Sequence, residues 1–95
     1  MKKSDVLSKL LSDFSDSVIA QDLCVERHDL SGGNAFAKKY IAAARGLLRF
    51  GPEGIDAFAS LLQHERIEVR TTAASYLLPF RTNEALNVLE QSKEA

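Results

Sequence analysis

Two short stretches of the chain hold residue types that could do chemistry. The run HERIE at 64–68 matches the zinc-binding pattern His-Glu-x-x-His up to its last position, which is Glu68. That pattern needs two imidazoles one turn apart on a helix, whereas we expect His64 at a corner, and His28 is distant in sequence. Cys24 would need an activating base to act as a nucleophile. We therefore expect no metal site, no cofactor and no catalytic residue.

A basic band is the strongest candidate for a binding site. Residues 32–50 contain four basic and no acidic side chains, while the segments on either side are mildly acidic. Such a band could receive an acidic protein surface or a phosphate backbone; the alternative is a solvated helix face. We expect three polar side chains of a later helix to adjoin it. The candidate partner-binding residues are Lys38, Lys39, Arg45, Arg49, Glu68, Thr72 and Ser75.

Composition restricts the classes of protein that the chain can represent. Ninety-five residues suit a single domain over 1–95. A formal net charge of −1 argues against a general nucleic-acid or membrane binder. No apolar run approaches the ~20 residues that span a bilayer. The one cysteine cannot form an internal disulfide, which favours a reducing compartment, and we expect a cytoplasmic protein.

Hydrophobic spacing predicts about five helices and no strand. Ser4 is the expected N-cap of the first helix, Asp29 or Ser31 that of the second, and Thr82 that of the last. The pair Gly32–Gly33 is expected to break the chain before the second helix, and the structure of residues 26–30 is left open. The predicted helices cover residues 4–25, 34–50, 53–63, 67–78 and 83–92.

Turn residues punctuate this pattern. Gly51 suits a left-handed turn and Pro52 the first position of the next helix. Pro79 is expected to end the fourth helix. We predict that Phe80 and Leu86 face inward with the other apolar residues. Arg70 is expected to pair with a nearby carboxylate, Glu65 or Glu68, or with a carbonyl of the corner.

The same pattern of residues occurs twice. AARGLLRF at 43–50 and AASYLLPF at 73–80 both have the pattern Ala-Ala-x-x-Leu-Leu-x-Phe, 30 residues apart. Each copy is followed by a turn and another helix. A recurring helix-turn-helix unit predicts an all-α, short right-handed α-solenoid, because each unit buries its apolar face only against a neighbour. We divide the domain into an N-terminal capping helix (1–30), a first repeat (34–63) and a second, truncated repeat (67–92).

The run LLQHERIEVRTTAASYL resembles a HEAT-type repeat, in particular the short bacterial kind. Val69, Arg70, Ala73 and Leu77 fall on that family's pattern, although Lys39-Tyr40 replaces Val-Arg in the first copy. The layout also looks like small bacterial HEAT-like domains of unknown function. The resemblance implies a rigid surface that binds another protein. Two and a half units are short for a solenoid, so the first helix closes one end or a homodimer extends the stack.

Three functional hypotheses follow from the sequence. The first is a non-catalytic protein-binding module: a regulator, an adaptor, or an immunity-type protein that masks a toxin. The second is nucleic-acid binding through the band at 38–49, and acidic flanks argue against it. The third is an enzyme, since some short HEAT-like repeats belong to lyases of bound chromophores. No residues suited to that reaction are evident, and the interaction module is the prediction that we carry forward.

Overall fold

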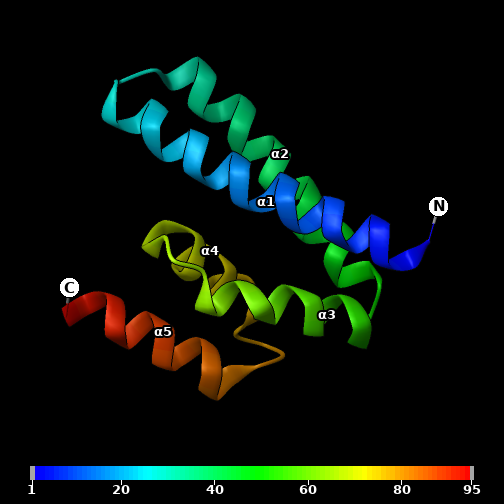
Figure 1. Cartoon of the computed structure of the whole chain (residues 1–95). Helices are drawn as coiled ribbons and strands as arrows, with labels where there is room; N and C mark the ends of the chain where they lie inside the picture. Colours follow the sequence, from blue (N-terminus) through cyan, green and yellow to red (C-terminus); the bar gives the residue numbers. More distant parts are fainter. Residues whose placement is uncertain (1, 95) are drawn as a thin grey trace.

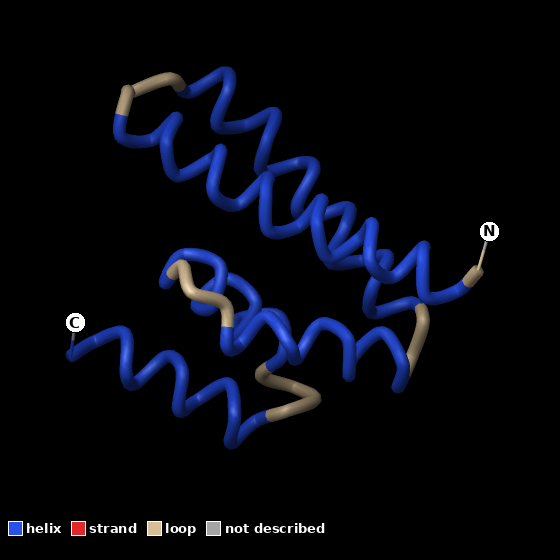
Figure 2. The backbone as a smooth tube through the Cα atoms, viewed as in Figure 1, coloured by secondary structure: helices blue, strands red, loops and turns tan. Residues whose placement is uncertain are grey.

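The structure is a computed structural model that describes the backbone of residues 2–94 and the side chains of residues 2–92. It is all-helical and contains no strand in this part of the chain, which confirms the predicted class. Short connections join the helices (Figure 2). The elements are α1 (Lys3–Glu26), α2 (Leu30–Arg49), α3 (Pro52–Ala59), the 3₁₀ turn η1 (Ser60–Gln63), α4 (Ile67–Leu77) and α5 (Thr82–Glu94).

Helices α1 and α2 form a long antiparallel hairpin that lies over the three shorter helices (Figure 1). Phe14 and Val18 recur one turn apart on α1 and are buried, so one face of the hairpin closes the core. None of the described helices is both long enough and apolar enough to cross a membrane.

The glycine pair does not break α2, contrary to the prediction. The helix begins at Leu30, four residues earlier than expected, and both glycines lie in its first turns. Asp29 is the N-cap, and its carboxylate accepts a hydrogen bond from the Gly32 N–H at 3.0 Å. A Cβ on Gly32 would overlap that carboxylate and stand 3.1 Å from Cys24 Sγ. The absence of a side chain at Gly32 therefore allows α2 to begin close against the end of α1.

The turn into α3 follows the prediction, and the helix end does not. Gly51 has φ 69° and Pro52 opens α3. The predicted single helix over 53–63 changes at Ser60 into a 3₁₀ turn, whose tighter winding is common at helix ends. Helix α4 ends at Leu77, two residues before Pro79, as expected.

An aromatic cluster joins the hairpin to the shorter helices. Phe14 of α1 lies edge-to-face on Phe58 of α3, with ring centroids 4.9 Å apart. Tyr40 of α2 and Tyr76 of α4 also meet Phe14 edge-on, at 5.9 and 6.1 Å. This geometry suits the quadrupoles of aromatic rings. Four helices thus meet at one buried phenylalanine.

Two side chains predicted to face inward are exposed. Phe80 is 51% exposed and Leu86 42% exposed. Phe80 follows Pro79 in the turn after α4, where the chain has left the helical path that carried the inward pattern. The main packing contacts of α5 are with α4 and η1. The outer side of α5, which includes Leu86, therefore stays open to solvent.

Two predicted caps are wrong. The N-cap of α1 is Lys2, and no side chain caps that end, because the helix starts before Ser4. The hydroxyl of Thr82 donates to the carbonyl oxygen of Leu78 at 2.7 Å and does not cap α5. It satisfies a free carbonyl at the end of α4 instead.

The duplicated patterns match in burial at their alanines and first leucines, but not at Phe50, which is half-buried, and Phe80, which is exposed. Both alanine pairs, 43–44 and 73–74, are buried, and so are Leu47 and Leu77. The elements around them are arranged differently, however. Helix α1 packs along α2 and also touches α3 and α4, while few contacts join α2 directly to α4. The molecule is a set of five packed helices, and its HEAT-like stacking stays a prediction.

Candidate interaction surface

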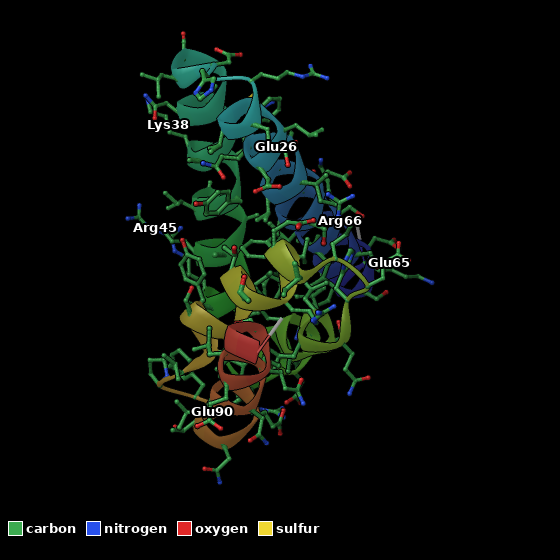
Figure 3. All side chains as sticks on the ribbon, turned by 90° about the vertical axis from the view of Figure 1, so that its left-hand side faces the viewer. Glu26, Lys38, Arg45, Glu65, Arg66 and Glu90 are labelled. Carbon is green, nitrogen blue, oxygen red and sulfur yellow. The ribbon has the colours of Figure 1, made fainter. Side chains whose placement is uncertain are left out.

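The basic band of Lys38, Lys39, Arg45 and Arg49 lies on α2, and all four side chains are exposed. Lys38 and Arg45 project from the same side of the molecule (Figure 3). None of the four pairs with a carboxylate among the described side chains. The local sequence explains this, because no acidic residue occurs between Asp29 and Glu53 and a helical ion pair needs one within four positions.

Lys39 differs from the rest of the band. Its Nζ lies 5.3 Å from the centre of the Phe36 ring, within the range of a cation–π contact. This contact directs Lys39 toward the side of α2 that faces α1. Lys38, Arg45 and Arg49 extend from the outer side of α2, at spacings of seven and four residues.

Arg45 also lies near α4. Burial raises the pKa of the Tyr76 hydroxyl above its ordinary value, the nearby Tyr40 raises it further, and Arg45 lowers it. The charge of Arg45 therefore acts on Tyr76, near the C-terminal end of α4. The four cations therefore extend over the C-terminal half of α2, from Lys38 near its middle to Arg49 at its end.

The three polar residues expected beside the band make other contacts. Glu68 forms an ion pair with Arg66, and the hydrogen bond from Arg66 lowers the pKa of the Glu68 carboxyl. The hydroxyl of Thr72 donates to the Glu68 carbonyl oxygen at 2.7 Å, and that of Ser75 to the Thr72 carbonyl oxygen at 2.7 Å. Each of these groups is thus already engaged within its own segment.

Arg66 and its partner Glu68 belong to the acidic side of the molecule. Asp22 and Glu26 of α1 act on Arg66 through charge and, with Glu68, raise its pKa. In Figure 3, Arg66 and Glu65 project from the side opposite Lys38 and Arg45. The structure therefore places the Arg66–Glu68 ion pair at the start of α4, away from Lys38 and Arg45, while Thr72 and Ser75 follow further along α4.

The isolated reactive residues have ordinary surroundings. His64 Nδ1 accepts a hydrogen bond from the Arg66 N–H at 3.0 Å, in the corner before α4. His28 occupies the left-handed turn between α1 and α2, with φ 59°. Cys24 is half-buried against the start of α2. Among the described side chains, no three of the types His, Cys, Asp and Glu gather as metal ligands would.

A groove between α1 and α2 was not foreseen from the sequence. Its volume is about 670 Å³, and its lining comes from both helices of the hairpin: Leu10, Asp13, Asp16, Ser17, Ala20, Phe36, Lys39, Ala42 and Ala43. The first helix was predicted only to cap the domain. The groove follows from the antiparallel pairing of α1 with α2, which spacing within one helix does not reveal. A smaller hollow of about 300 Å³ lies at the hairpin tip, beside Val25 and Leu30.

Comparison of the chain with models of known families, with curated proteins and with solved structures found no match in any of the three.

Proposed function

We propose that this protein is a non-catalytic interaction module that presents the basic band of α2 to an acidic surface of another protein. One observation supports the proposal most directly: four exposed cations lie on a single helix, and none has an ion-pair partner among the described residues. Elsewhere in the chain, Lys3, Lys9 and Arg81 do pair with carboxylates. The band is therefore the main group of cations without an ion-pair partner among the described residues.

The helix that bears the band is held in place by the fold. Ala43, Ala44 and Leu47 anchor α2 in the core, and Asp29 caps its start. A rigid helix loses little conformational freedom when a partner binds, so more of the interaction energy is realised as affinity. Complementary charge would also speed the encounter with an acidic partner.

Nucleic acid is the alternative partner for the same four cations. Four phosphate contacts would give a salt dependence with a slope of about −3 to −4 in log–log form. The acidic residues that flank the band, Asp29 and Glu53, and the net charge of −1 favour a protein instead. A regulator, an adaptor and an immunity-type protein are the roles compatible with such a module.

The proposal also includes a HEAT-like fold and a cytoplasmic location, and a different observation supports each. The equal burial of the two Ala-Ala-x-x-Leu patterns supports a HEAT-like relation between them. The single cysteine, half-buried and without a disulfide partner in the chain, supports a cytoplasmic location.

Affinity capture with matched charge variants tests the proposed surface. The wild-type chain, Arg45→Glu/Arg49→Glu and the control Lys2→Glu/Arg27→Glu are immobilised and exposed to nuclease-treated lysate of the source organism. The two variants change net charge equally, and Lys2 and Arg27 lie at the two ends of α1. We expect wild type and control to retain a specific acidic protein that the band variant loses.

Two results would contradict this proposal. Equal capture by wild type and the band variant would show that the band is not the binding surface. A gel shift of duplex DNA at low salt, abolished by the band variant and steeply reduced by added salt, would establish the nucleic-acid alternative.

A further inference from the structure

The groove of the hairpin lies on the face that the shorter helices leave uncovered. Asp13, Asp16 and Ala20 are on the opposite side of α1 from Leu11 and Val18, which face the core. The floor is made by Leu10, Phe36 and Ala43 together with other small side chains. The groove is therefore a shallow channel with an apolar floor, and its two walls are the side-by-side helices α1 and α2.

The two walls carry opposite charge. Asp13 and Asp16 line the α1 wall, and Lys39 lines the α2 wall. Asp13 is already paired with Lys9 at 3.3 Å, whereas Asp16 and Lys39 have no ion-pair partner among the described residues. The groove thus offers, on opposite edges, one carboxylate and one ammonium that have no ion-pair partner among the described residues.

The two free charges lie at the same level along the hairpin. Leu10 packs against Gly46, and Cys24 packs against Gly32 and Gly33, which fixes the antiparallel register. In this register Lys39 is level with residues 16–17 of α1. A twofold rotation about an axis parallel to the hairpin preserves that level and brings α1 of one copy opposite α2 of the other.

We propose that the occupant of the groove is a second copy of this chain, related by that twofold axis. In this dimer Asp16 of each copy faces Lys39 of the other, and the two apolar floors are closed against each other. A twofold axis perpendicular to the hairpin would set the two acidic walls against each other. Opposite charges therefore favour the dimer whose twofold axis is parallel to the hairpin over the one whose axis is perpendicular to it.

The available surface is sufficient for a weak, specific dimer. The 20 residues of α2 give a paired length of about 30 Å, and two adjacent helices are about 20 Å wide. The face is then about 600 Å² per chain, or about 1,200 Å² in total, at the lower end of specific interfaces. Lys39 belongs both to the basic band and to the groove, whereas Lys38, Arg45 and Arg49 do not line the groove. Variants at Arg45 and Arg49 therefore test the basic band separately from the dimer.

Analytical ultracentrifugation of charge variants tests the dimer, over a roughly hundredfold concentration range around 10 µM. We expect a concentration-dependent dimer for wild type. Lys39→Glu alone and Asp16→Lys alone each set like charges together twice and should weaken dimerisation at least about tenfold. An equimolar mixture of the two variants should form a heterodimer, since all its facing pairs are again opposite in charge. Arg45→Glu, the control on the same helix, should dimerise as wild type does.

The mixture of the two variants distinguishes the proposed dimer from the absence of one. Recovery in the mixture, but in neither variant alone, would establish that Asp16 of one copy faces Lys39 of the other. A wild-type chain that stays monomeric over the whole range would overturn the proposal, as would a mixture that fails to associate. Circular dichroism checks that both variants fold, which we expect because Asp16 and Lys39 are exposed.

Discussion

The carbonyl oxygen of Leu47 lies directly against Gly54, at the point where α3 crosses the end of α2. A Cβ on Gly54 would overlap that oxygen and stand 2.7 Å from Phe50 Cβ. Gly54 is buried, and neither obstructing group is the flexible end of a long side chain. The close approach of the two helices thus depends on the absence of a side chain.

Gly54→Ala is therefore expected to destabilise the protein by about 3 kcal/mol, because backbone atoms must move apart. Urea unfolding followed by circular dichroism measures the loss. Gly46→Ala is the control: its Cβ would meet only the Leu10 side chain, at 3.0 Å, and alanine favours helix by about 1 kcal/mol. A Gly54 variant as stable as the Gly46 variant would show that the crossing is looser than described.

Leu77→Ala is expected to cost about 2–5 kcal/mol, since the fully buried side chain of Leu77 would leave a cavity in the core. The free energy of unfolding is again the measurement. Leu86→Ala removes the same atoms from a side chain that is 42% exposed and should cost no more than about 1 kcal/mol. Equal losses for the two leucines would contradict the assigned core.

Arg70 ties α4 to the corner before it. Its Nη1 donates to the carbonyl oxygens of His64, at 2.8 Å, and Glu65, at 3.1 Å, which confirms the corner-carbonyl alternative of the prediction. Arg70→Lys is expected to lose about 1–2 kcal/mol, because the ammonium cannot reproduce the reach and geometry of the guanidinium. Arg27→Lys, at an exposed residue whose side chain makes no hydrogen bond to the described residues, should change stability by less than about 0.5 kcal/mol. Identical denaturation curves for the two variants would assign Arg70 no structural role.

Stability should fall in acid partly through Glu68. The hydrogen bond from Arg66 lowers the folded-state pKa of Glu68 below its ordinary value of 4.5. The unfolded chain therefore binds the proton more tightly, and this contribution is present above pH 4.5 and lost as the pH falls through the folded pKa. Glu68→Gln should show a smaller drop in stability than wild type between about pH 7 and about pH 3. Glu65→Gln removes a neighbouring exposed carboxylate without an ion pair and serves as control; an unchanged pH profile in the Glu68 variant would refute the role of this pair.

Much of the fold was predictable because its signals are local. The apolar spacing of Phe14 and Val18, the Gly51–Pro52 turn and the Pro79 stop each act within a few residues, and the structure retains them. The errors arise where distant segments meet. Helix α2 begins at Leu30 because Gly32, which has no side chain, leaves room for the Asp29 carboxylate and for Cys24 of α1. Phe80 is exposed because the chain turns after Pro79.

The candidate interaction surface also has one part that local sequence predicts and one part that depends on contacts between distant segments. The basic band follows from the sequence alone, since four cations without an acidic neighbour remain unpaired on one helix. The groove does not, because Asp16 and Lys39 are 23 positions apart and become facing walls only when α1 pairs with α2. The prediction that Glu68 adjoins the band missed Arg66, two residues away, which engages that carboxylate first.

The chain has no tryptophan and two tyrosines, and both tyrosine rings meet Phe14, one from the hairpin and one from α4. Tyrosine absorbance and emission of the unlabelled protein therefore originate where the hairpin packs against the shorter helices. Any motion that lifts the hairpin away from the rest of the molecule will register in that signal, without a dye or an introduced reporter.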